Sequence, residues 1–158
     1  MKKLTIALAL LSLAACQSAE QERRADAQAY ARLASHEARS EMEAADPALK
    51  ARLASAAGWA AFGSTGDSLF SRKSGDGLGL AHDNARQSDT PMRIIVPGTD
   101  RRLGLRTFRA LVVFSDPAAF AQFVKGGDLP ASGDGIDVRW NEDGVAVPPP
   151  SGVTCRPE

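Results

Sequence analysis

Hydrophobic and polar positions follow three patterns along the chain, and each predicts a different kind of structure. The first fifteen residues start with two lysines after Met1 and are then mostly apolar. Residues 17–45 are polar and rich in Ala, Glu, Arg and Gln, which are good helix formers. From Gly58 onward, glycines separate short apolar runs, a pattern typical of antiparallel strands joined by tight turns. The chain is therefore expected to be helical first and to form a sheet afterwards.

The polar segment 17–45 has only a weak apolar spine, made of Ala25, Ala29, Leu33 and Ala38. A stripe that is mostly alanine is too thin to anchor a helix firmly to a core, so we expect a helix or a frayed tether. As one continuous helix, this segment would reach about 44 Å at about 1.5 Å per residue.

Two shorter helices are predicted from their start signals. Asp46 is a good N-cap and Pro47 suits the first helical position, so a helix is expected from Pro47 to about Ala57. Asp116-Pro117 opens another helix in the same way, and Gly126-Gly127 ends it.

Short apolar runs between turn signals predict six strands and a final hairpin. The strands are expected at Trp59–Phe62, Ser68–Arg72, Leu78–His82, Met92–Val96, Leu103–Thr107 and Phe108–Phe114. The hairpin is expected from Ile136–Trp140 and Gly144–Val147, around Asn141–Asp143. The last eleven residues, Pro148–Glu158, are expected to be a disordered tail.

The N-terminus has the order of a targeting segment. Met1-Lys2-Lys3 is followed by an apolar run of roughly ten residues, too short to span a bilayer that needs about 20. The run ends in Leu13-Ala14-Ala15-Cys16, which resembles the lipobox of bacterial lipoproteins. The resemblance implies a signal peptide over residues 1–15, acyl chains on Cys16 and, with Gln17 next to it, sorting to the outer membrane. The alternatives are an ordinary secretory signal followed by an accidental Cys, or a buried N-terminal helix.

Length and charge narrow the function classes. A chain of 158 residues allows one small domain, and 19 basic against 19 acidic residues disfavours a nucleic-acid-binding protein. Without residues 1–15 the chain loses Lys2 and Lys3, which leaves 17 basic and 19 acidic residues and a net charge of −2. Stable membrane attachment would then come from the acyl chains on Cys16.

Few residues suggest catalysis or metal binding. With Cys16 acylated, Cys155 is the remaining thiol, and its place after three prolines favours an exposed, incidental group. His36 and His82 lie far apart without a second His at ligand spacing, and His82-Asp83 is interpreted as a surface turn. We therefore expect no metal, no cofactor and no enzyme activity. A hydrolase using Ser64 or Ser74 stays a weak third possibility.

The segment Gly75-Asp76-Gly77-Leu78-Gly79 lacks the spacing and the following helix of a nucleotide-binding loop. Alternating glycines in a strand more often indicate close backbone packing or a bend.

Arginines are concentrated in one part of the chain. Five of them fall within seventeen residues that contain one acidic residue, Asp100: Arg93, Arg101, Arg102, Arg106 and Arg109. If Met92–Val96 pairs with Leu103–Thr107, Arg93 and Arg106 could be cross-strand neighbours. Guanidinium groups suit phosphate oxygens, so the set could hold a lipid head group, or it could simply solubilise outward-facing strand positions.

The order of the pieces over residues 46–127 resembles the SYLF domain, a family of lipid-binding modules that in bacteria often occurs as small lipoproteins. The resemblance is carried by Asp46–Ala57 with Gly58–Phe62, then Gly77–Asn84, Thr90–Arg93, Leu103–Arg109, Leu111–Phe114 and Phe123–Gly127. It implies a compact α+β fold of mainly antiparallel, barrel-like β-sheet with a few short helices. It also implies binding of membrane lipid head groups without catalysis. The chain departs from the family at Arg72-Lys73-Ser74, where the family is richer in glycine, and after the second helix.

These observations predict four segments: the signal peptide 1–15, a lipidated Cys16 with a helical tether to residue 45, a SYLF-like domain over 46–147 and a tail over 148–158. The leading hypothesis is a lipid-anchored envelope protein, facing the periplasm from the outer membrane, whose arginines contact head groups. The alternative is an assembly lipoprotein that uses segment 17–45 as a spacer or a partner helix. The sequence names no protein partner for it.

Overall fold

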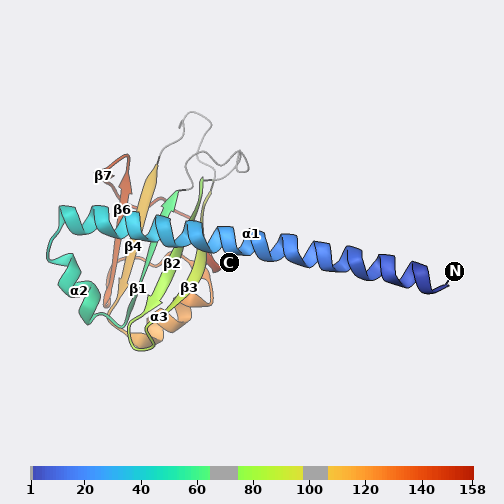
Figure 1. Cartoon of the computed structure of the whole chain (residues 1–158). Coiled ribbons are helices and arrows are strands. Elements are labelled where there is room, and N and C mark those ends of the chain that lie inside the picture. The colour runs from blue at the N-terminus through green and yellow to red at the C-terminus, as the bar shows by residue number, and fades with distance from the viewer. Residues whose placement is uncertain (1, 65–74, 98–106) are drawn as a thin grey trace.

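The computed structural model describes residues 2–64, 75–97 and 107–158, with side chains from residue 20 on (Figure 1). The described elements are α1 (Lys2–Ala45), α2 (Leu49–Ser55), β1 (Gly58–Ser64), β2 (Gly75–Asp83), β3 (Ser88–Val96), β4 (Phe108–Phe114), α3 (Pro117–Val124), β5 (Gly127–Asp128), β6 (Ile136–Glu142), β7 (Val145–Ala146) and β8 (Thr154–Pro157). The expected strands Ser68–Arg72 and 103–106 lie outside the described residues.

The described strands form one antiparallel sheet in the order β5-β8-β3-β2-β1-β4-β6-β7, curled into a half-barrel. Helix α1 crosses one face of the sheet with its C-terminal part and projects far beyond it with its N-terminal part (Figure 1). The expected α+β fold with mainly antiparallel strands is confirmed.

Side-chain alternation along the strands divides the apolar residues between two cores. On β4, Leu111 and Val113 face α1 and α2, where they pack with Ala38, Met42 and Leu49. The opposite face holds the larger core, in which the aromatic side chains of β4 and α3 pack together: Phe114, Phe120 and Phe123. Both faces of the sheet are therefore covered.

A stripe of small residues on α1 packs firmly against the sheet, which corrects the expectation of a weakly attached tether. The predicted spine is wrong except at Ala38, because Ala25, Ala29 and Leu33 are exposed. Ala31, Ala34, Ala38 and Met42 are buried. Gly63 on β1 lies so close to α1 that a methyl group there would come within 3.3 Å of the Ala34 Cβ. Small side chains on both elements let backbone approach backbone, and the close packing replaces the thickness of a leucine stripe. Residues 31–45 thus belong to the domain.

The glycines of β2 have the structural role that their alternation suggested. A methyl group on Gly77 would meet the Gly63 carbonyl oxygen at 2.7 Å, and one on Gly79 would collide with the Ala61 carbonyl oxygen. Strand β2 therefore lies too close to β1 for side chains at these two positions.

The C-terminus is ordered, so the expected disordered tail is wrong. Strand β8 pairs with β3 from Met92↔Pro157 to Ile95↔Thr154, and Val153 and Cys155 are buried. The prolines at 148–150 only lead the chain across to this edge. Pairing with a strand some sixty residues earlier leaves no local signal in the tail itself.

The predicted helix starts are partly right. Asp116 caps α3, because its carboxylate accepts hydrogen bonds from the backbone N–H groups of Ala118 and Ala119. Helix α2 begins later than expected, at Leu49, and Asp46 instead accepts a bond from the Ala48 backbone N–H in the preceding turn.

Candidate functional site

The structure describes two of the five arginines between Arg93 and Arg109. Arg101, Arg102 and Arg106 lie outside the described residues. Arg93 on β3 and Arg109 on β4 lie in one row across the sheet, since Arg109 is opposite Gly63, Gly63 opposite Leu78 and Leu78 opposite Arg93. Three strand spacings of about 4.8 Å separate them by about 14 Å along the sheet.

Arg93 is held by carboxylates of the chain itself. Its guanidinium donates two hydrogen bonds to Glu158, at 2.8 and 2.7 Å, and lies 3.6 Å from Asp76. The hydrogen bonds from Arg93 lower the pKa of Glu158, and the same bonds raise the pKa of Arg93. The pairing considered between Met92–Val96 and Leu103–Thr107 does not occur over Met92–Ile95, because β2 and β8 occupy both sides of β3 there.

Arg109 is also paired within the molecule. Its guanidinium donates to Glu37 on α1 at 3.0 Å and lies 3.9 Å from Glu41. Neither of these two arginines is therefore a free donor for a head group. Arg93 binds the C-terminal residue Glu158, and Arg109 binds Glu37 of α1.

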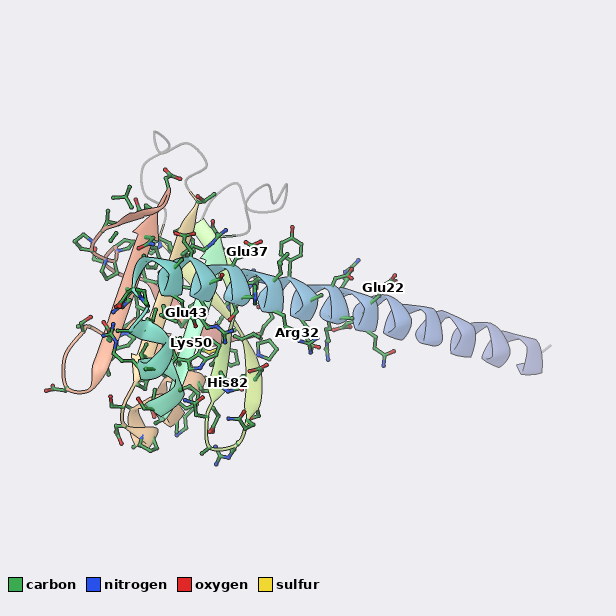
Figure 2. All side chains as sticks on the ribbon, turned by 60° about the vertical axis from the view of Figure 1, so that its left-hand side comes forward. Glu22, Arg32, Glu37, Glu43, Lys50 and His82 are labelled. Carbon is green, nitrogen blue, oxygen red and sulfur yellow. The ribbon has the colours of Figure 1, made fainter. Side chains whose placement is uncertain are left out.

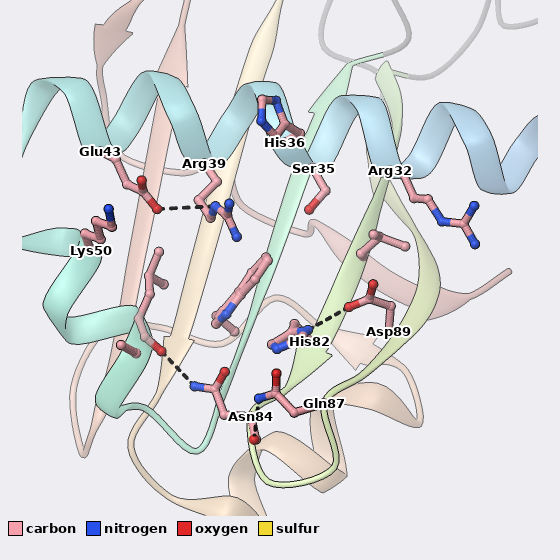
Figure 3. A pocket seen from close by; sticks show the side chains of 14 residues that line it. Arg32, Ser35, His36, Arg39, Glu43, Lys50, His82, Asn84, Gln87 and Asp89 are labelled. Carbon is pink, nitrogen blue, oxygen red and sulfur yellow. Dashed lines mark hydrogen bonds and ion pairs between the residues drawn. The ribbon is translucent and has the colours of Figure 1, made fainter.

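A second feature, which we call the α1 groove, lies between the C-terminal part of α1, helix α2 and strands β1 to β3 (Figure 3). It encloses about 820 Å³, within the usual range for small-molecule sites of about 300–1,000 Å³. Figure 2 shows that Glu43 of α1 and Lys50 of α2 lie over the sheet and that His82 lies on the sheet itself, while Glu22 lies on the projecting part of α1.

Ion pairs and caps fix the α2 wall of the groove. Asp46, between α1 and α2, accepts from Arg52 at 2.6 Å and from Arg139 of β6 at 2.9 Å. The hydrogen bond from Arg139 is the main cause that lowers the pKa of Asp46. At the other end of α2, the Asn84 amide donates to the carbonyl oxygens of Leu53 and Ala56, which satisfies carbonyl groups left open at the helix end.

Aromatic and cationic groups stack at the floor of the groove. The Trp59 ring stacks on the His82 ring at 5.1 Å, and the Arg39 guanidinium lies 5.2 Å from the Trp59 ring centre. His82 Nδ1 lies 2.7 Å from a carboxylate oxygen of Asp89. Because a carboxylate can only accept, Nδ1 carries the proton, and Nε2 is the other ring nitrogen left for a ligand.

The groove has a surplus of positive charge. Arg32, Arg39 and Lys50 line it together with two carboxylates, Glu43 and Asp89. Glu43 is paired with Arg39 at 3.2 Å and Asp89 with His82. Among the described residues, Arg32 and Lys50 have no carboxylate within ion-pair distance, so they are the groove's open cations.

Ser35 supplies a polar group to the groove. Its side chain comes from α1 and points toward the strands (Figure 3), and the residue is only 3% exposed. A serine inside a helix often bonds to the carbonyl oxygen one turn earlier. The contacts of the described residues include no such bond, and none between Ser35 and His82. The hydroxyl oxygen is not sealed from solvent, so it opens to the groove and has no adjacent base.

The other residues considered for catalysis have structural roles or fall outside the described part. The Ser64 hydroxyl accepts from the Phe108 backbone N–H at 3.1 Å, and Ser74 is not among the described residues. The Asp83 carboxylate accepts from the backbone N–H groups of Ala85 and Arg86 in the turn, while His82 pairs with Asp89. Within residues 20–64, 75–97 and 107–158, no three side chains gather as metal ligands.

Cys155 is buried, so the expectation of an exposed thiol is wrong. It is 1% exposed, and burial raises the pKa of its thiol to about 12. Such a thiol is inert, and it is unsuited to an intermolecular bridge. Cys16 lies within α1, fifteen residues before Ala31, the first buried residue among the described side chains of that helix.

Sequence reasoning missed the α1 groove because its walls come from three separate segments. One local signal was present: Arg32, Ser35, Arg39 and Glu43 follow helical spacing and share one face of α1. The interspersed charges of both signs in segment 17–45 favour a solvated face, whereas the sheet lies beneath this part of α1.

A scan of protein-family models and a search of curated proteins found no match to the chain. The SYLF resemblance therefore stays a prediction. No helix in the described part of the chain combines the length and apolar character needed to cross a membrane.

Proposed function

We propose that the chain is a lipid-anchored, non-catalytic protein of the cell envelope that binds anionic membrane head groups. Acyl chains on Cys16 would attach it to the outer membrane, with the domain in the periplasm. The observation that carries the proposal is that Cys16 lies on the helix that also covers the sheet. A lipid at Cys16 would therefore hold the domain at a membrane surface, where even weak head-group contacts act at high effective concentration.

The geometry of α1 sets a condition for head-group binding. Between Cys16 and Ala31 the helix rises about 22 Å, so an upright α1 would keep the sheet away from the membrane. Head-group contact needs α1 to lie along the surface. Since Arg93 and Arg109 are already paired, Arg101, Arg102 and Arg106 are the arginines proposed to make it.

Flotation of the non-acylated Cys16→Ser protein with anionic liposomes tests this proposal. We expect retention that weakens with salt, because exposed charges are screened within about 10 Å at 0.1 M. Retention should fall when Arg101, Arg102 and Arg106 are changed to Gln together. Arg86→Gln is the control, since Arg86 is an exposed arginine in the turn between β2 and β3. No retention at low salt, or equal retention of both variants, contradicts head-group binding.

The anchor is tested separately by labelling cells with radioactive palmitate. Label should enter the natural protein, and Cys16→Ser should abolish both the label and the recovery of the protein with membranes. A labelled Cys16→Ser protein, or an unlabelled natural one, contradicts anchoring at Cys16.

The projecting part of α1 favours a second candidate, an assembly protein that uses this helix as a spacer or a partner helix. Residues 20–30 lie before the buried part, and their described side chains are mostly exposed, Tyr30 at 54%. Deleting 20–30 removes about three helical turns, shortens the spacer by about 16 Å and keeps the buried residues. Crosslinking in cells followed by co-purification measures the partners of the natural protein and of this variant. The assembly role is supported if the variant loses one specific crosslinked partner and the natural protein does not bind liposomes.

A further inference from the structure

We propose that the α1 groove is a binding site for a small phosphate-bearing ligand, separate from the arginines assigned to the membrane. Two features of the groove point to an anion, and a third suits the rest of such a ligand.

The first feature is the hydroxyl of Ser35. Ser35 is 97% buried as a residue, but its hydroxyl oxygen points into the groove and keeps contact with solvent there. No hydrogen bond to another described residue occupies the hydroxyl, so it can donate to a ligand in the groove. A phosphate oxygen would accept this hydrogen bond.

The second feature is the charge that the groove leaves open. Both of its carboxylates are already engaged, Glu43 by Arg39 and Asp89 by His82. Arg32 and Lys50 are not engaged by any described carboxylate, and they lie toward opposite ends of the groove (Figure 3). Arg32 is three residues before Ser35 on α1, so the two are neighbours on one helix face. The Arg32–Ser35 end is therefore the phosphate subsite, and Lys50 adds attraction from the other end.

The third feature is a floor that suits the rest of such a ligand. Trp59, which contacts Arg39 and His82, and the apolar side chains of Leu53 and Leu80 line the groove. A guanidinium suits phosphate oxygens, while an aromatic and aliphatic floor suits an apolar body. The class of ligand is thus a phosphate ester with a compact organic group, either free in solution or carried by a lipid.

The chain contains its own optical probe for this site. Trp59 lines the groove, whereas Trp140 is buried in the core of the opposite face, stacked on Phe108 at 4.7 Å. The full chain with Cys16→Ser, kept in a neutral detergent, can be titrated with phenyl phosphate while tryptophan emission is recorded. We expect a saturable change that Trp59→Phe removes and that phenol, the uncharged counterpart, does not produce.

Substitutions locate the phosphate. Ser35→Ala and Arg32→Gln should each weaken phenyl phosphate binding at least about fivefold, and Lys50→Gln should weaken it less. Arg86→Gln keeps a similar charge change outside the groove and should leave the affinity unchanged. Circular dichroism and the unfolding midpoint of each variant show that it is folded, so a weakened affinity reports on the site.

A second arm separates the two sources of the phosphate. Micelles containing phosphatidic acid are added at the same phosphate concentration as phenyl phosphate. If only phenyl phosphate gives the Ser35-dependent change, the ligand is a free solute; if phosphatidic acid gives it too, the groove also accepts a lipid phosphate. The proposal is overturned if neither probe gives a saturable change, or if Ser35→Ala and Arg32→Gln both bind like the natural protein. This assay depends on no acyl anchor and on no residue from Arg93 to Arg109. A failure of the groove proposal therefore leaves the liposome flotation result unchanged, and a failure of liposome flotation leaves the groove proposal unchanged.

Discussion

Replacing the Cys155 thiol by a hydroxyl tests whether the C-terminal strand belongs to the core. In Cys155→Ser, the new hydroxyl would sit where the thiol is now 1% exposed, in the apolar cluster of the larger core. Losing a small buried apolar group costs about 1 kcal/mol, and burying a hydroxyl without a partner costs about 1–3 kcal/mol. The expected loss is thus about 2–4 kcal/mol, a large part of the about 5–15 kcal/mol that stabilises a small domain.

Urea unfolding followed by tryptophan fluorescence measures this loss, in a Cys16→Ser background so that Cys155 is the only thiol. With a slope of about 1–3 kcal/mol per molar urea, the midpoint should fall by about 0.7–4 M while the slope stays the same. Arg156→Ser is the matched control, because Arg156 is the next residue of β8 and is exposed. It should change the free energy of unfolding by no more than about 0.5 kcal/mol. A Cys155→Ser protein as stable as its control would refute the ordered strand.

Three further outcomes follow from contacts described above. Gly79→Ala should lower the free energy of unfolding by about 3 kcal/mol or more, because the added methyl group meets the Ala61 carbonyl. Gly75→Ala is the control and should be tolerated, because the nearest atom to its methyl group is 3.5 Å away. Equal thermal unfolding midpoints of the two variants would contradict the clash. Iodoacetamide at pH 8 should modify Cys155 only after unfolding, because a thiol pKa of about 12 leaves almost no thiolate in the folded protein. Mass spectrometry measures the modification, and rapid labelling of the folded protein would show that β8 is not buried. Because Arg93 lowers the pKa of Glu158, the pair stabilises the fold above the ordinary carboxyl pKa of 4.5 and ceases to do so as the pH falls through the lowered value. The difference in unfolding free energy between natural protein and Glu158→Gln should therefore shrink between pH 7 and pH 3, and a constant difference would count against the pair.

What the sequence predicted well is local. Asp116-Pro117 and Gly126-Gly127 mark the ends of α3 within a span of twelve residues, and the N-cap bonds occur as expected. The alternating glycines of β2 likewise reported the lack of space beside β1. The helix ends depend on the capping residues themselves, and the need for glycine in β2 depends on the adjacent strand β1, so both causes are local.

What the sequence did not predict depends on distant segments. The partner of β8 is β3, so nothing near Cys155 reveals that this thiol is buried. The alanine stripe of α1 looked too thin because the matching surface, Gly63, lies on another element. The α1 groove was missed for the same reason, and the charges of Arg93 and Arg109 were overvalued because Glu158 and Glu37, which neutralise them, are 65 and 72 residues away in sequence.

The dual role of α1 has a mechanical consequence. The helix that leads to Cys16 also forms one wall of the α1 groove, through Arg32, Ser35 and Arg39. Tension on an anchored Cys16 would run along the helix axis and load the contacts from Ala31 to Met42, together with the Glu37–Arg109 pair, in shear. A pull strong enough to slide α1 off the sheet would dismantle the groove before it broke the strand ladder behind it. Force on the tether and occupancy of the groove would then oppose each other, so a bound ligand would make the anchored protein harder to pull apart.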